Sequence, residues 1–165
     1  IIFIKIYNYM LYWIFDLDLT LYQLPENKEF DYEYLNNDKQ LLYLLKSIPC
    51  EKLMFTNGTY GHANNCIKKI ELYDIFTNIV SRDMINCLKP SNSSYEKFIK
   101  LNNIKNKDKC VFFDDQPINL IESKKYGWIT VLISKEKVFE ERIDFQFSNI
   151  HLALNYFLSK IKGIN

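Results

Sequence analysis

The sequence lacks the features that mark a disulfide-stapled or membrane-spanning protein. Its four cysteines are widely spaced along the 165 residues and form no CxxC pair, which is typical of reduced, mostly buried thiols in an intracellular protein. The apolar amino end is interrupted by Lys5 and Asn8, and it is too short and too polar for a transmembrane helix. We therefore expect a cytoplasmic protein without a membrane partner.

A strong net charge of either sign is also absent. The formal net charge is +1 at pH 7, which gives no electrostatic argument for a nucleic-acid partner, although it does not exclude one. The chain has no internal repeats and no long linker, so residues 1–165 are expected to form one domain. Met10 is a candidate natural start, which would make residues 1–9 an upstream extension.

What the sequence does have is a regular alternation of short apolar runs and longer amphipathic segments. The runs predict strands at residues 11–15, 52–55, 78–81, 110–113 and 128–133, with an edge strand at 144–147. The segments between them predict helices at residues 38–48, 60–72, 118–126 and 150–161, and one between Pro90 and Leu101. This alternation predicts an α/β fold with a Rossmann-like, doubly wound, mostly parallel sheet and helices on both faces.

Polar residues follow the expected strands at the points where these strands end. They are Asp16, Asp18, Thr56, Asn57, Asp114 and Asp115, and Lys89 lies in a loop before a helix. In such sheets, ligands bind at the carboxyl ends of the strands, near the point where the strand order reverses. Four separate segments are therefore expected to converge on one site.

The chemistry of this set is that of phosphoryl transfer. Four carboxylates and one lysine, without a histidine or cysteine nearby, make an oxygen-rich site that suits Mg²⁺. One carboxylate can attack phosphorus to form an aspartyl-phosphate, and a second, two residues on, can serve as general acid and then as general base. Lys89 could neutralise charge, while Thr56 and Asn57 could donate hydrogen bonds to phosphoryl oxygens.

The sequence resembles the haloacid dehalogenase superfamily of aspartate-nucleophile phosphatases. The four motifs of that family occur in order over about residues 13–133, as DxDxT at 16–20, FTNG at 55–58, KP at 89–90 and FFDD at 112–115 with Asn119 after it. Each motif alone also fits a structural reading, such as a turn, a solvated lysine or a helix cap. Four motifs in order on the expected elements favour the family.

The resemblance implies a role for each carboxylate of the first motif. Asp16 would be the nucleophile and a ligand of Mg²⁺. Asp18 would be the general acid/base, and its backbone carbonyl would also reach the metal. An aspartate at this second position favours phosphate transfer over dehalogenation, which does not need that acid.

The resemblance also implies roles for the other three motifs. Thr56, Asn57 and Lys89 would hold the phosphate, and Lys89 would also position the nucleophile. Asp115 is favoured as the direct metal ligand, with Asp114 beside it.

Within the superfamily, the motifs look most like those of pyrimidine 5′-nucleotidase-like phosphatases, which carry a helical cap domain. Here 37 residues separate Asp18 from Thr56, and 30 separate Gly58 from Lys89. The expected helices and strand use these lengths, so no separate cap fits. We expect an open site, covered at most by the loop at 23–37 or by a second subunit of a homo-oligomer.

Several alternatives follow from an open site. A phosphoprotein or a nucleic-acid end could cover the site itself and be the substrate in place of a small phosphate ester. A module of weak catalytic power that binds a partner protein is a reading of a different class. We expect no carboxylate or cysteine partner at ligand spacing for His62 and His151, so we expect them to be surface or helix residues.

Overall fold

The computed structural model describes residues 11–106 and 108–162 of the chain. The expected upstream extension at residues 1–9 lies outside the described residues. Among the residues described, no helix is both long and apolar enough to cross a bilayer. The four cysteines are free thiols, and Cys66 and Cys110 are buried.

Six parallel strands form one sheet, as the alternation in the sequence predicts. They are β1 (Leu11–Phe15), β2 (Glu51–Phe55), β3 (Asn78–Val80), β4 (Lys109–Asp114), β5 (Ile129–Ile133) and β6 (Phe145–Phe147). Their order across the sheet is β3-β2-β1-β4-β5-β6. The expected edge strand is confirmed as β6, and the order of connection reverses between β1 and β4, where such sheets bind ligands.

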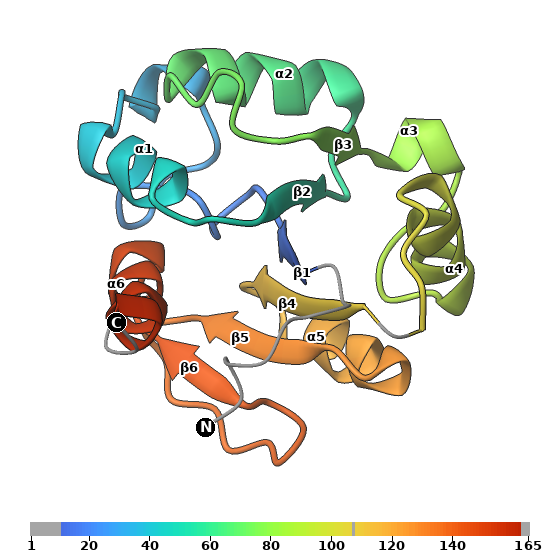
Figure 1. Ribbon diagram of the computed structural model, residues 1–165. Coiled ribbons are helices and arrows are strands. Elements are labelled where there is room, and N and C mark those ends of the chain that lie inside the picture. Colours follow the sequence, from blue (N-terminus) through green and yellow to red (C-terminus); the bar gives the residue numbers. More distant parts are fainter. Residues whose placement is uncertain (1–10, 107, 163–165) are drawn as a thin grey trace.

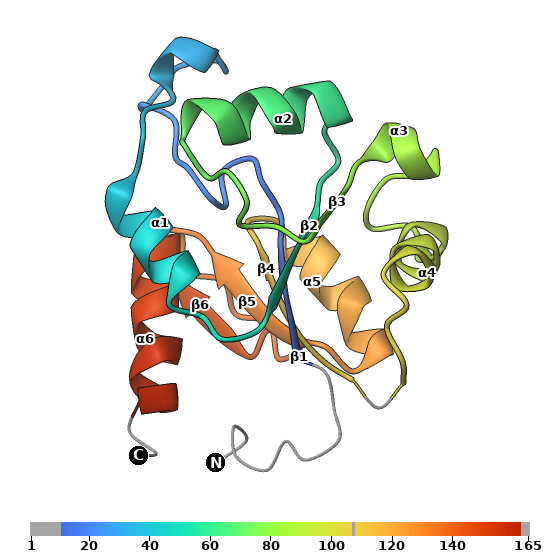
Figure 2. The same ribbon diagram turned by 45° about the horizontal axis from the view of Figure 1, so that its top comes forward.

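Helices cover both faces of the sheet (Figures 1 and 2). They are α1 (Lys39–Lys46), α2 (Tyr60–Lys69), α3 (Arg82–Ile85), α4 (Asn92–Leu101), α5 (Pro117–Ser123) and α6 (Ile150–Lys162), with 3-10 turns η1 (Tyr32–Tyr34) and η2 (Lys124–Tyr126). Residues of α1, α2 and α6 share one buried cluster with the sheet, and residues of α3, α4 and α5 share the other. The doubly wound architecture is therefore confirmed.

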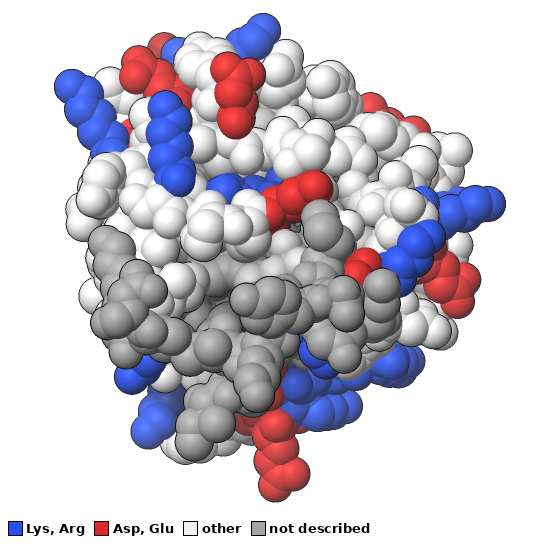
Figure 3. All heavy atoms as spheres, in the orientation of Figure 1, with Lys and Arg blue, Asp and Glu red and all other residues white. Residues whose placement is uncertain are grey.

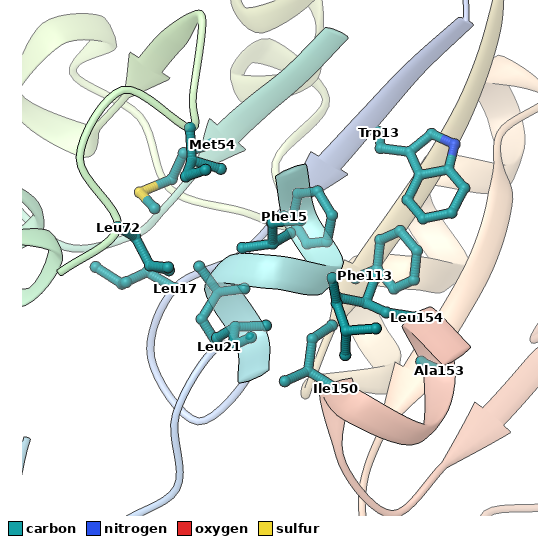
Figure 4. Packing of buried hydrophobic residues seen from close by; sticks show 14 of the residues in the cluster. Trp13, Phe15, Leu17, Leu21, Met54, Leu72, Phe113, Ile150, Ala153 and Leu154 are labelled. Atoms are coloured by element: carbon teal, nitrogen blue, oxygen red, sulfur yellow. The ribbon is translucent and has the colours of Figure 1, made fainter. Parts of the chain in front are cut away.

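The side chains of β1 alternate between these two clusters because successive residues of a strand point to opposite faces. Trp13 and Phe15 face the cluster of α1, α2 and α6, where Phe15 stacks on Phe113 of β4 with ring centroids 4.7 Å apart. Figure 4 shows Leu17 and Leu21, from the turn after β1, packed into the same cluster. Full burial of a Leu or Phe side chain contributes about 1.5–3 kcal/mol, so this packing holds the segment after β1 firmly in place.

Asp38 caps α1, as the sequence predicts, since its carboxylate accepts a hydrogen bond from Leu41 N at 2.8 Å. The same carboxylate lies 2.7 Å from His151 Nε2 on α6. The expectation that His151 has no carboxylate partner is therefore wrong. The two residues are far apart in the chain, and only the packing of α1 beside α6 brings them together (Figure 1).

Candidate active site

The ends of β1 and β4 bring three carboxylates together. Asp16 N–H donates to the carbonyl of Phe113 at 2.9 Å, which extends the β1–β4 ladder by one residue. Asp114 is the last residue of β4, and Asp115 follows it. Carboxylate oxygens of Asp16, Asp114 and Asp115 lie within 4.8 Å of one another.

A buried lysine neutralises much of this charge. Lys89 Nζ lies 2.8 Å from Asp16 Oδ1 and 2.7 Å from Asp114 Oδ2. It also sits over the rings of Phe55 and Phe112, 5.1 and 5.2 Å from their centroids. Burial alone would lower the pKa of Lys89, but the Asp114 and Asp16 carboxylates outweigh it and raise the pKa. The lysine is therefore held charged between the two acids.

Asp114 and Asp115 differ in how far their oxygens are already used. Asp114 is fully buried, and its carboxylate accepts hydrogen bonds from Asn119 Nδ2 at 3.0 and 3.1 Å and from Gln116 N at 2.8 Å. Asp115 is partly exposed, and its Oδ2 accepts a bond from Gln116 Nε2 at 2.6 Å. The Asp115 side chain is thus the more available of the two.

Burial, together with the neighbouring carboxylates, raises the pKa of Asp16 and of Asp115. Burial, opposed by Lys89 and reinforced by the Asp114 and Asp115 carboxylates, raises the pKa of Asp16 to about 7. Burial and the neighbouring Asp114 raise the pKa of Asp115 to about 6. A cation bound between the carboxylates would relieve this repulsion, so the site has the electrostatic character of a cation site.

The turn after β1 carries Asp18 away from this cluster. Leu19 has a left-handed φ of 59°, which is uncommon for a residue other than glycine. The chain turns back at Thr20, whose hydroxyl lies 3.4 Å from Asp16 Oδ2. The turn therefore leaves Asp16 buried and directs Asp18 outward, where its side chain is 40% exposed.

The second motif follows β2. Thr56 is buried, and its Oγ1 accepts a hydrogen bond from Gly58 N at 2.9 Å. The side-chain amide of Asn57 makes two bonds to the backbone of Lys89: Nδ2 donates to the carbonyl at 3.0 Å, and Oδ1 accepts from Lys89 N at 2.8 Å. Asn57 thus fixes the loop that carries Lys89, a contact that the sequence reading did not foresee.

Two side chains contact the carboxylate of Asp18, and a third contacts one of these two. Tyr22 OH donates to Asp18 Oδ1, and His62 Nε2 lies 2.6 Å from the same oxygen. His62 Nδ1 lies 2.9 Å from Tyr32 OH. The expectation that His62 has no carboxylate or cysteine partner is therefore wrong, since Cys66 Sγ also lies 3.6 Å from its Nε2.

Sequence reasoning missed His62 because 44 residues separate it from Asp18. One signal was available. Thr59 can cap a helix, and it does so here, with Oγ1 accepting from His62 N at 3.2 Å. A cap at Thr59 places His62 in the first turn of α2, next to the end of β2.

An open cleft of about 480 Å³ adjoins Asp18. Tyr22, Leu24 and Phe30 provide the apolar lining of this cleft. Asn57 and Gly58 of the second motif form another side, and Arg82 adds a positive charge. Leu24 and Phe30 belong to the segment between β1 and α1, whose turn η1 rises beside α2 in Figure 2. The cleft therefore extends from Asp18 between the segment at 23–37 and the second motif.

The sequence matches the family model described as haloacid dehalogenase-like hydrolase over residues 22–133. The chain belongs to this family. The matched span contains Thr56, Lys89 and both Asp114 and Asp115, while Asp16 and Asp18 lie just before it.

Solved structures of this family share the fold. L-2-haloacid dehalogenase from Xanthobacter autotrophicus, with chloropropionic acid covalently bound, has a TM-score of 0.64 at 15% identity, over 81% of this chain and 64% of the dehalogenase. The HAD-hydrolase YfnB from Bacillus subtilis, bound to magnesium, has a TM-score of 0.68 at 10% identity, over 92% of this chain and 100% of that one. The chain thus spans less than two thirds of the dehalogenase's length.

Proposed function

We propose that this hydrolase is a Mg²⁺-dependent phosphatase that cleaves a phosphate monoester through an aspartyl-phosphate on Asp16. The proposal rests on the different surroundings of two carboxylates that lie two residues apart in the chain. Asp16 is buried against Lys89, as a nucleophile fixed in one orientation requires. Asp18 faces an open cleft, where it can exchange a proton with a leaving group. A dehalogenase does not need this second acid.

The donor set of the site fits Mg²⁺. The carboxylates of Asp16 and Asp115 and the backbone carbonyl of Asp18 would hold the ion, since Mg²⁺ prefers a few hard oxygen ligands. Asp115 is favoured as the direct ligand because Asp114 is already bonded to Lys89 and Asn119. When bound, Mg²⁺ would neutralise and orient the transferred phosphoryl group.

The residues of the chain account for both halves of the reaction. Asp16 attacks phosphorus, the bond between phosphorus and the leaving oxygen breaks, and Asp18 gives its proton to that oxygen. Asp18 then takes a proton from the water that attacks the aspartyl-phosphate, which releases phosphate and restores the Asp16 carboxylate. Lys89 balances the charge of Asp16, and Thr56 and Asn57 are the proposed donors to the phosphoryl oxygens.

The proposed substrate is a small phosphate ester, with a cytoplasmic enzyme acting through an open, capless site. Between Asp18 and Thr56 the described chain forms η1, α1 and the core strand β2 as its regular elements, and the segment at 23–37 would serve as the partial cover. The apolar cleft wall supports a leaving group with an apolar part, and a nucleotide remains a candidate. The formal net charge of +1 favours a small ester over a nucleic-acid end. Over the described part of the one face drawn in Figure 3, acidic and basic side chains are interspersed.

Hydrolysis of p-nitrophenyl phosphate, with and without Mg²⁺, tests the proposal against the dehalogenase alternative. We expect Mg²⁺-dependent turnover that Asp16→Asn lowers by at least about 10⁴-fold, and no chloride release from L-2-chloropropionate. Chloride release without phosphatase activity would assign the dehalogenase reaction instead. A folded protein inactive in both assays would favour the partner-binding module.

A further inference from the structure

We infer that His62 is a positioning residue that fixes the carboxylate of Asp18 for proton transfer, an inference that rests on the proposed phosphatase function. His62 lies outside the four motifs, and the reaction above assigns it no step. Its imidazole nevertheless makes the 2.6 Å contact with Asp18 Oδ1. The imidazole therefore touches the proposed general acid/base directly.

The direction of the hydrogen bonds follows from the partners. An ionised Asp18 only accepts hydrogen bonds, so His62 Nε2 carries the proton and Nδ1 accepts from Tyr32 OH at 2.9 Å. Tyr22 OH also donates to Oδ1 of Asp18. Two donors on Oδ1 leave Oδ2 as the oxygen free to carry the catalytic proton.

The free oxygen is directed toward the second motif. A Cβ carbon placed on Gly58 would lie 3.6 Å from Asp18 Oδ2, so this oxygen faces the turn proposed to bind phosphate. The bonds to Oδ1 thus aim the reactive oxygen at the place where the leaving group departs. Fixing a catalytic group in a productive orientation is a recognised source of rate enhancement.

His62 is itself held from several sides. The Phe30 ring packs edge-on against the imidazole, with centroids 5.0 Å apart, and Thr59 anchors its backbone. A Cβ carbon on Gly58 would come within 2.8 Å of His62 Cδ2, so only glycine leaves room for the ring in this position. Phe30 and Tyr32 belong to the segment at 23–37, which links the cover of the cleft to the orientation of the acid.

The test compares substrates whose leaving groups need protonation to different degrees. A p-nitrophenolate leaves readily without a proton, whereas an alkoxide needs the general acid. We expect His62→Leu to lower the rate of aspartyl-phosphate formation, measured by rapid quench, by about tenfold or more for an alkyl phosphate and by less than about threefold for p-nitrophenyl phosphate, with KM nearly unchanged. Hydrolysis of the aspartyl-phosphate, which uses Asp18 as the base, should slow equally for both substrates. His62→Gln, which keeps an N–H donor, should recover part of the loss, and Tyr32→Phe should act in the same direction.

The matched control is His151→Leu, which removes the contact between His151 and Asp38. It should leave the ratio of the two rates unchanged. Equal losses in the rate of aspartyl-phosphate formation from both substrates would assign His62 a general structural role, and a raised KM would assign it to substrate binding. Either result would overturn the inference while the wild-type turnover still supports the proposed function.

A measurement independent of activity separates the two proposals further. Long-range ¹H–¹⁵N spectra of the histidine rings should identify His62 as the Nε2–H tautomer, with a signal that moves in Asp18→Asn and stays in Asp38→Asn. A wild type without phosphatase activity would overturn the proposed function and its positioning role together. A His62 signal insensitive to Asp18→Asn would overturn the contact on which the inference stands.

Discussion

Two parts of the site are built in different ways. The inner part consists of Asp16, Lys89, Asp114 and Asn119, which are all buried and joined by direct hydrogen bonds. The outer part consists of Asp18, Tyr22, Tyr32 and His62, which are at least partly exposed and come from a turn, a loop and a helix start. The inner part depends on the β1–β4 register, while the outer part depends on how the segment at 23–37 packs on α2.

This difference indicates a separation of tasks. Charges that must not move are placed where the sheet itself fixes them, since a low-dielectric interior strengthens their interactions. The proton-transferring group is placed where solvent and substrate reach it. Each prediction below changes one part and asks whether the other responds.

The largest effect is expected from Lys89→Met, which leaves Asp16 and Asp114 buried without their cation. Breaking a buried ion pair in this way costs about 3–5 kcal/mol of unfolding free energy. The loss should be greater at pH 8 than at pH 5, because protonation of Asp16, whose pKa burial raises to about 7, relieves it at the lower pH. Urea denaturation measures this, with Lys125→Met as the control, since that exposed partner of Glu122 should change stability by less than about 1 kcal/mol.

Asp18→Asn should separate the two chemical steps. Without the general acid/base, steady-state kcat is expected to fall by about 10²–10⁴-fold. The aspartyl-phosphate should still form from p-nitrophenyl phosphate, because that leaving group needs little protonation. A burst of p-nitrophenol equal to the enzyme concentration, absent in Asp16→Asn, would be seen in rapid-mixing experiments. A variant without a burst and without turnover would instead show that Asp18 is needed to form the aspartyl-phosphate.

The effect of Mg²⁺ on the stability of the protein should follow the pKa of Asp16 in the inner part. Asp16 has a pKa of about 7 in the folded protein against 3.8 for an unperturbed carboxyl. Stability of the metal-free protein should therefore fall as pH rises from about 4 to about 7, because only the unfolded chain has released the proton in that window. Mg²⁺ binds the ionised acids, so its stabilising effect should grow over the same range.

At a hundredfold excess over Kd, Mg²⁺ should add about 2.7 kcal/mol, or roughly 5–10 °C in Tm at pH 8. Differential scanning fluorimetry at pH 5 and pH 8 measures both trends. Asp16→Asn should flatten the pH dependence. A Mg²⁺ shift that is as large at pH 5 as at pH 8 would argue against a site formed by these carboxylates.

The smallest effect is expected from Arg82→Gln at the rim of the cleft. An exposed charge contributes about 0.2–1 kcal/mol to an ion pair, so KM for an anionic ester should rise by no more than about fivefold, with kcat unchanged. The dependence of KM on salt should weaken in the same variant. Arg142→Gln is the matched control, because Arg142 pairs with Glu140 and does not line this cleft.

The sequence was sufficient to predict the inner part of the site. Buried strands that end in acids leave little choice of position, because parallel strands meet at one edge of the sheet. The alternation of apolar runs also predicted all six strands, with no bound off by more than one residue. The helix α3 was not predicted, because four residues are too few to show a period.

The outer part could not be predicted in the same way. His62 meets Asp18 across 44 residues and Tyr32 across 30, and such contacts depend on the path of an irregular loop. The same holds for the contact of Asp38 with His151, which rests on the packing of two helices. The hydrophobic pattern of a sequence indicates its regular helices and strands. These contacts instead form where a loop or a second helix packs against such an element.

The bonds between Asn57 and the backbone of Lys89 bear on how this chain could change in length. Because both the N–H and the carbonyl of Lys89 are bonded to a residue at the end of β2, its place does not depend on the number of residues that lead up to it. We expect the exposed stretch around Leu88 to accept inserted residues at little cost in stability. New loops could then be added beside the cleft, and substrate preference altered, while the lysine stays against its two acids.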